Sequence, residues 1–176
     1  SYTYEKAGTY ILKTQRLLYQ IDGNTKNTFV KIINAHKYLS VWGISEIFSN
    51  CVNLIEADLS NLAGKVFNAN SMFYQCSKLT KITAYGLTPT NCDNLFKGCS
   101  SLTEIVLNLP ETESPLQLDR TFANCSNVTK ITLNQDPYNS GRNLNLDSTS
   151  FGVFQGCSNL RQVIVYGTNA HTIVKN

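Results

Sequence analysis

The chain of 176 residues has no long hydrophobic run and no leader-like beginning. No stretch approaches the ~18 consecutive apolar residues of a membrane-spanning helix. No basic segment is followed by an apolar run and a small-residue cleavage site, which is the pattern of a secretory signal peptide. The sequence as it stands therefore predicts neither a membrane span nor a signal peptide.

The chain is also poor in the groups that enzymes use. Its two histidines, His36 and His171, fall near opposite ends of the sequence and are not expected to meet. Glu111 and Glu113 share one loop, but such a pair is more typical of a solvated turn than of a glycosidase acid and nucleophile. The phosphate-binding patterns G-x-x-x-x-G-K-[S/T] and G-x-G-x-x-G are absent. We therefore expect no catalytic residues and no enzymatic activity.

Sites for metals, cofactors and nucleic acids have equally little support. No C-x-x-C spacing occurs, and Cys92 and Cys99 are seven positions apart on different parts of a repeat. The 15 basic residues, which give a net charge of +3, are spread along the chain. Nucleic-acid-binding domains concentrate such residues on one face. The sequence predicts no metal ion, no cofactor and no nucleic-acid partner.

What the sequence does contain is a repeated pattern, F-x-x-C-x-x-[L/V]-x-x-[apolar]-x-[apolar]. Five copies begin at Phe48, Phe73, Phe96, Phe122 and Phe154. Their cysteines are Cys51, Cys76, Cys99, Cys125 and Cys157, separated by 25, 23, 26 and 32 residues. A unit of this length cannot bury its own apolar face and must stack on its neighbours to form a core. The pattern therefore predicts a solenoid.

Each coil is predicted to combine a helical part with a strand, because the periodicity changes within the pattern. Phe and Cys lie three residues apart, and an apolar or small residue precedes the Phe by four, which fits one face of a short helix or helical turn. Beyond the Cys, apolar residues such as Ile82 and Ala84 alternate as in a strand. The predicted fold class is α/β. It is a leucine-rich-repeat solenoid of about five coils, with a short parallel β-sheet on one face and short helices or turns on the other.

These repeats resemble those of BspA-like bacterial surface proteins and the related repeats of mycoplasma lipoproteins, in which Phe and Cys replace some of the usual leucines. The resemblance covers roughly residues 44–166. The segment from Tyr2 to Leu12 resembles the closing strand of PKD-like, immunoglobulin-type domains of bacterial surface proteins. In such proteins this strand can lead through a Trp-Gly pair, here Trp42-Gly43, into the repeats. Together the resemblances imply a secreted or cell-surface protein whose leader was removed before Ser1.

The segments outside the repeats are expected to form a cap, a tail and two loops. The predicted division is 1–43 as N-terminal β cap and lead-in strands, 44–166 as leucine-rich repeats and 167–176 as C-terminal tail. The turn signal Asp22-Gly23-Asn24 predicts a hairpin between the runs 16–21 and 28–33 of the cap. Prolines and other turn residues predict insertions at 108–121 and 134–152. These insertions are either binding loops or tolerated drift in a surface connection.

All six cysteines are predicted to be reduced and buried. Five share one phase of the repeat, and Cys92 takes the apolar position four before Phe96. Helical turns on one side of the coils would need ~8–10 Å between neighbours, which exceeds the ~7 Å limit between the Cα atoms of a disulfide. We therefore interpret the cysteines as small core residues and not as a disulfide framework.

The outward face of the sheet is the predicted binding surface. Residues two and four positions after the repeat Leu or Val point outward and form two columns. The first column is Glu56, Lys81, Glu104, Lys130 and Gln162, and the second is Asp58, Thr83, Val106, Thr132 and Ile164. Alternating charges in the first column predict cross-strand ion pairs and no strong charged site.

The second column drifts from acidic to apolar, which favours contact with a protein surface of mixed polarity. Tyr85 and Tyr166 follow strand ends and are expected either to add aromatic contacts at the rim or to pack against the next loop. Tyr138 and Arg142, in the second insertion, complete the candidate ligand-binding residues.

The BspA-like resemblance implies an extracellular or cell-surface binding module that serves adhesion without catalysis. The implied partner is a host extracellular-matrix or plasma protein, or a glycan. Two alternatives stay open, because repeats define a scaffold and not a ligand. One is a structural spacer within a larger surface protein, and the other is a phage or appendage decoration domain that binds bacterial glycan.

Overall fold

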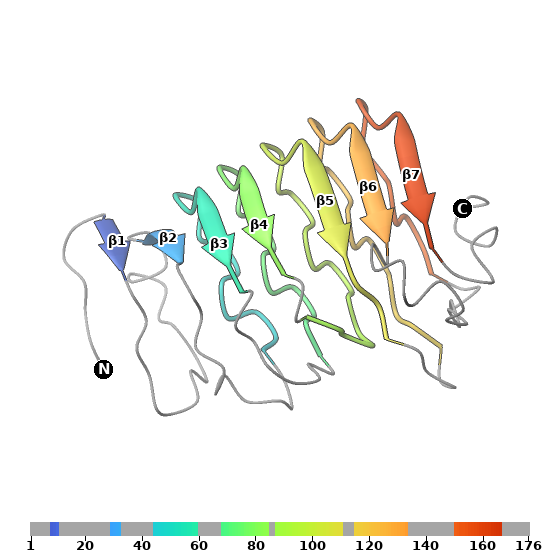
Figure 1. The fold of residues 1–176 in the computed structure, drawn as a ribbon, viewed down its shortest axis with the longest axis horizontal. Coiled ribbons are helices and arrows are strands. Elements are labelled where there is room, and N and C mark those ends of the chain that lie inside the picture. Colours follow the sequence, from blue (N-terminus) through green and yellow to red (C-terminus); the bar gives the residue numbers. More distant parts are fainter. Residues whose placement is uncertain are drawn as a thin grey trace.

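A computed structural model describes residues 8–10, 29–32, 44–59, 68–84, 87–110, 115–133 and 150–166. In these residues the chain winds through a row of short strands that lie along one face (Figure 1). The strands are β1 (Gly8–Tyr10), β2 (Phe29–Ile32), β3 (Glu56–Asp58), β4 (Lys81–Thr83), β5 (Glu104–Leu107), β6 (Lys130–Leu133) and β7 (Gln162–Val165). All neighbouring strands that pair do so in parallel, which confirms the predicted parallel strands.

The strands belong to two sheets. The first has the order β1-β2-β3-β4 and the second the order β5-β6-β7. Within each sheet the register places equivalent repeat positions opposite one another, as with Glu56 and Lys81 or Glu104 and Lys130. Equivalent side chains therefore stand in columns, as the pattern predicts. The columns are interrupted once, between β4 and β5.

In the described residues the side of each coil opposite the strands is made of turns, so of the two predicted forms, short helices or turns, the structure has the turns. The described ranges contain no helix, and hence none that could cross a membrane. Some amides close four-residue turns, as where the Cys76 N–H donates to the Phe73 carbonyl at 3.2 Å. Others donate to the next coil, as where the Phe73 N–H donates to the Leu95 carbonyl at 2.9 Å. In a helix the backbone amides donate to carbonyls of the same helix. Here some of these amides donate to the next coil instead, so no helix forms.

Two residues with positive φ give these turns their shape. They lie two positions before and two after the repeat Phe: Ser71 (53°) and Gln75 (59°) flank Phe73. Positive φ at the third residue of a four-residue turn is type II geometry, and it stops a right-handed helix from continuing. The other coils repeat it at Glu46 and Asn50, Asn94 and Gly98, Arg120 and Asn124, and Gly152 and Gly156.

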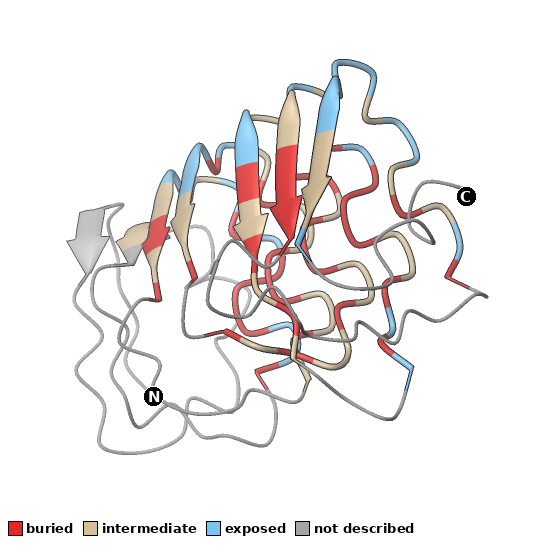
Figure 2. Ribbon diagram, turned by 45° about the vertical axis from the view of Figure 1, so that its right-hand side comes forward, coloured by how far each residue is buried: buried red, intermediate tan, exposed pale blue. Residues whose placement is uncertain are grey.

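The core contains a column of stacked phenylalanine rings. Successive ring centroids of Phe48, Phe73, Phe96, Phe122 and Phe154 are 5.5, 5.8, 6.1 and 5.8 Å apart. The first four rings are fully buried, and Phe154 of the last coil is partly buried. Buried residues recur in each coil from β3 to β6 (Figure 2). Stacked aromatic pairs of this kind add about 0.5–1.5 kcal/mol each beyond the burial of their area.

The cysteines are free thiols, and five of the six are buried, with Cys157 partly exposed. The core assignment is therefore confirmed for five of them. The helical spacing assumed from the sequence is wrong, because turns and not helices join the described coils. Among the five repeat cysteines, each thiol after that of Cys51 donates to the carbonyl of the previous coil's Phe, as Cys76 does to Phe48 at 3.1 Å, whereas the Cys92 thiol donates to the Pro89 carbonyl at 3.7 Å.

The start of the chain continues the parallel sheet. Strand β2 pairs in parallel with β1 on one edge and with β3 on the other. Both edges of 29–32 are thus occupied, and the predicted hairpin with 16–21 is wrong, whereas the N-terminal β cap with its lead-in strands stays a prediction. Residues 16–21 themselves lie outside the described residues. The boundaries at 43 and 166 and the PKD-like resemblance stay predictions.

Candidate binding face

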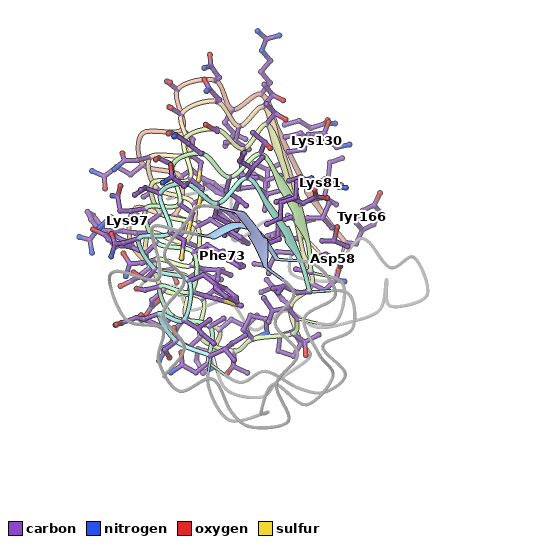
Figure 3. All side chains as sticks on the ribbon, turned by 90° about the vertical axis from the view of Figure 1, so that its left-hand side faces the viewer. Asp58, Phe73, Lys81, Lys97, Lys130 and Tyr166 are labelled. Carbon is purple, nitrogen blue, oxygen red and sulfur yellow. The ribbon has the colours of Figure 1, made fainter. Side chains whose placement is uncertain are left out.

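The outward face of the strands presents the two predicted columns in register. Glu56 lies opposite Lys81, and Asp58 lies opposite Thr83. On the second sheet Val106, Thr132 and Ile164 lie opposite one another in turn. Figure 3 shows Asp58, Lys81, Lys130 and Tyr166 on one side of the molecule, Lys97 on the other, and Phe73 between them.

The charged column forms ion pairs on the first sheet. Glu56 lies between two lysines, with one carboxylate oxygen 2.6 Å from Lys81 Nζ and the other 2.9 Å from Lys31 Nζ. Hydrogen bonds from Lys81 and then Lys31 lower the pKa of Glu56, and the bond to Glu56 raises the pKa of Lys81. The predicted pairing is confirmed here, so this part of the face carries little free charge.

On the second sheet the charged column behaves differently. Glu104 and Lys130 lie opposite one another in register, yet within the described residues neither makes an ion pair within 4 Å. Glu104 is exposed and Lys130 is half-buried. The expectation that the first column is largely neutralised by pairs is therefore wrong for β5 and β6, which present separate charges beside the second column.

The second column changes character along the array. Asp58, Thr83, Val106 and Ile164 are half-buried, whereas Thr132 is 5% exposed and offers little surface to a partner. The column is acidic or hydroxylic on β3 and β4 and mainly aliphatic on β5 and β7. The aliphatic part is flanked by one exposed aromatic residue, because Tyr166 follows β7 and is 40% exposed.

The structure brings some candidate residues together and leaves others untested. The Tyr166 N–H donates to the Leu133 carbonyl at 3.1 Å, which extends the β6–β7 ladder and places Tyr166 at the strand ends beside Ile164. Tyr85, Tyr138 and Arg142 lie outside the described residues. Their place in a ligand site stays a prediction.

The turn side carries contacts that the sequence interpretation missed. Lys97 Nζ lies 5.5 Å from the ring centroid of Tyr74, and the guanidinium carbon of Arg120 lies 5.0 Å from that of Phe151. Phe151 is 59% exposed. Tyr74 and Lys97 both directly follow the repeat Phe, so aligning the coils would have placed them side by side. Cation–π contacts at exposed sites contribute about 0.5–1 kcal/mol.

The described residues contain no metal-binding cluster, and burial suppresses the reactivity of their core thiols. No cluster of three or more His, Cys, Asp or Glu side chains is placed to hold a metal ion there. Burial raises the pKa of Cys125 to about 12 and also raises that of Cys99. These thiols are therefore protonated and unreactive at neutral pH.

Comparison with known proteins identifies the repeats. The family model for the BspA type leucine rich repeat region, described with six copies, matches residues 44–176. Among solved structures, the crystal structure of the T. pallidum leucine rich repeat protein matches with 19% sequence identity and a TM-score of 0.44. That match covers 82% of this chain and 75% of the other. No curated protein gives a significant match to the sequence.

Proposed function

Because this chain belongs to the BspA-type leucine-rich repeat family, we propose that it is a non-catalytic protein-binding module displayed on, or secreted from, a bacterial cell. Proteins of this family are often surface-associated and bind other proteins, and the leucine-rich-repeat fold typically serves as a binding scaffold. The match covers the chain from residue 44 onwards. Family and fold thus support a binding role.

The observation that carries this proposal is the outward face of β5–β7. Val106 and Ile164 stand in register with Thr132 between them, and Tyr166 borders them at the strand ends. Aliphatic side chains beside an exposed tyrosine, with charges at the margin, are the composition that protein interfaces favour. Glu104 and Lys130, without an ion pair in the described residues, supply charges of both signs beside it.

The finer proposal is adhesion to a host extracellular-matrix or plasma protein. A face of mixed polarity without a strong field suits a protein surface better than a polyanion. A glycan is the other ligand class that a screen has to include. A structural spacer would bind neither, and a phage or appendage decoration domain would bind bacterial glycan.

A binding screen tests the proposal. The intact chain is measured by biolayer interferometry against arrayed extracellular-matrix proteins, plasma proteins, host glycans and bacterial glycans. Ile164→Glu places a charge in the aliphatic column, and Lys97→Glu makes a charge change on the turn side as the matched control. We expect binding to a protein that Ile164→Glu weakens by about tenfold or more and that Lys97→Glu leaves unchanged.

The outcomes separate the alternatives. Binding only to bacterial glycan would support the decoration domain, and binding to nothing would support the spacer. Protein binding that Lys97→Glu abolishes and Ile164→Glu does not would move the site to the turn side.

A further inference from the structure

The sheet is interrupted between β4 and β5 while the coils that carry these strands stay joined. The two strands belong to separate sheets and form no ladder with each other. Figures 1 and 2 both show them farther apart than the neighbouring strands within either sheet. On the turn side the same two coils keep the normal contacts, with the Gln75 N–H donating to the Lys97 carbonyl at 2.7 Å and the Phe73 and Phe96 centroids 5.8 Å apart. We call the facing edges of Lys81–Thr83 and Glu104–Leu107 the β4–β5 break.

Backbone groups point into this break from both sides. The Lys81 N–H and the Thr83 carbonyl bond toward β3, so the alternation of a parallel strand turns the N–H and carbonyl of Ile82 the other way. The Thr103 carbonyl accepts a bond from the Thr129 N–H, toward β6. By the same alternation, the backbone groups of Glu104 and Val106 face β4. Neither edge supplies the other with a partner, and two such edges are templates for pairing with another strand.

On the β4 side of the break the core is less covered than at the equivalent positions of other coils. Ile82 occupies the inward strand position that Ala57, Ile105 and Ile131 occupy in their coils. Those three are buried, with at most 1% exposure, whereas Ile82 is only partly buried. Ile82 lies in an interior coil, so the chain end does not explain its exposure. An aliphatic side chain placed in the break beside Ile82 would cover it.

The outward side of the break carries one unmatched charge. Lys81 on β4 is already paired with Glu56 at 2.6 Å. Glu104 on β5 is exposed and, among the described residues, has no ion pair. A basic residue placed between them in this column would have Lys81, held by Glu56 at 2.6 Å, as a like-charged neighbour on one side and would pair with Glu104 on the other.

We propose that the β4–β5 break binds an extended segment of a partner protein, which adds a strand between β4 and β5. This inference rests on the proposed function and specifies how the partner binds. The backbone of the segment bonds to Ile82 on one side and to Glu104 and Val106 on the other, the general mode of β-strand addition. Its sequence alternates, with an aliphatic residue facing the core next to a lysine or arginine beside Glu104.

A peptide selection tests the sequence preference. The intact chain is used to select from a phage-displayed library of random 12-residue peptides, and one enriched peptide is synthesised for affinity measurement. We expect enrichment of a basic residue directly next to an aliphatic one. Glu104→Lys should change the basic preference to an acidic one. Lys130→Glu, in the same column on a strand whose two edges are both paired, should leave the preference unchanged.

A backbone variant tests the hydrogen bonds. Ile82→Pro removes the N–H that faces the break and should weaken binding of the enriched peptide about tenfold. Val163→Pro removes the equivalent N–H from the outer edge of β7 and serves as the control for a proline in a strand. Equal loss of binding in both variants would overturn the assignment to the break.

Hydrogen exchange supplies a readout that does not depend on a variant folding. In the free protein the amides of Ile82, Glu104 and Val106 should exchange much faster than that of Ile131, which faces β7. The enriched peptide should slow all three. Protection of the three amides in the free protein would mean that the break is already filled by this chain, and would overturn the inference. Protein binding that depends on Ile164 and not on Ile82 would overturn it while leaving the proposed function intact.

Discussion

The thiol of Cys99 donates a hydrogen bond of 3.1 Å to the carbonyl oxygen of Phe73, one coil earlier in the array. That carbonyl also accepts the Cys76 N–H at 3.2 Å, so one oxygen joins a turn within one coil to the side chain of the next. The same thiol bond recurs from Cys76 to Phe48, Cys125 to Phe96 and Cys157 to Phe122. The repeat cysteine is therefore a donor between coils as well as a core residue.

The first prediction concerns this donor. Cys99→Ala removes the thiol and leaves a small cavity, and we expect the free energy of unfolding to fall by about 1–2 kcal/mol. Cys99→Ser keeps a donor of smaller size and separates loss of the bond from loss of volume. Urea unfolding followed by circular dichroism measures both variants. Cys99→Ala with wild-type stability would show that the thiol bond and its packing contribute nothing.

The second prediction concerns the positive-φ positions. Gly98 has φ 81°, and a Cβ atom there would lie 2.8 Å from the side chain of Gln75. We expect Gly98→Ala to lower stability by about 1–2 kcal/mol. Ser71 holds φ 53° without being glycine, so Ser71→Gly should raise stability by up to about 1 kcal/mol. Thermal unfolding checks the pair, and destabilisation by Ser71→Gly of the size seen for Gly98→Ala would contradict the argument from backbone strain.

The third prediction is the order in which the thiols react. Burial raises the pKa of Cys125 to about 12 and raises that of Cys157 as well. Cys157 is the one partly exposed cysteine. In the native protein at pH 8, iodoacetamide should label Cys157 first and the other five only after denaturation, as followed by mass spectrometry of peptides. Rapid labelling of Cys99 in the native state would contradict its place in the core.

These features show what the sequence predicts and what it leaves open. The Phe and Cys spacing predicts the core columns and the strand register, because side chains of equivalent residues must stack for a repeat to bury its face. The same spacing does not distinguish a helical turn from consecutive type II turns, because Phe73 and Cys76 face the core in both conformations. The positive φ at Gln75 and Asn124 decides between them, and glycine stands at such a position in only some coils.

The binding face was predictable in part for a similar reason. Alternation predicts which residues point outward, and the columns are in register as expected. Burial of Thr132 and the break between β4 and β5 depend on how far apart neighbouring coils sit. That spacing is set by packing along the whole array, which no single repeat encodes.

The fourth prediction is a pH dependence that comes from Glu56. Its pKa is lowered from an ordinary value of 4.5 by hydrogen bonds from Lys81 and Lys31. A carboxylate whose pKa is lowered in the folded state stabilises the protein at pH values above its ordinary pKa. That contribution is lost as the pH falls through the folded-state pKa. The stability difference between wild type and Glu56→Gln should thus be present at pH 7, decline as the pH falls below 4.5 and disappear once the pH lies below the lowered folded-state pKa.

Urea unfolding at several pH values measures that difference. Glu104→Gln is the matched control, because Glu104 occupies the equivalent strand position without an ion pair in the described residues. It should show a smaller stability loss at neutral pH. Salt should reduce the effect of Glu56→Gln, because exposed pairs are screened. A difference that stays constant from pH 7 to pH 3 would exclude the ion pairs as its cause.

The fifth prediction compares the centre of the phenylalanine column with its end. Phe96 is fully buried and stacks against rings on both sides, at 5.8 and 6.1 Å. Phe154 is partly buried and, in the described residues, stacks against Phe122 alone. In an array stabilised by contacts between neighbouring coils, loss of a central residue weakens two interfaces and loss of a terminal residue weakens one. We therefore expect Phe96→Ala to cost about 3–5 kcal/mol and Phe154→Ala clearly less, as measured by urea unfolding. Equal losses would mean that the last coil is as well covered as the central ones, and that further residues pack on its outer side.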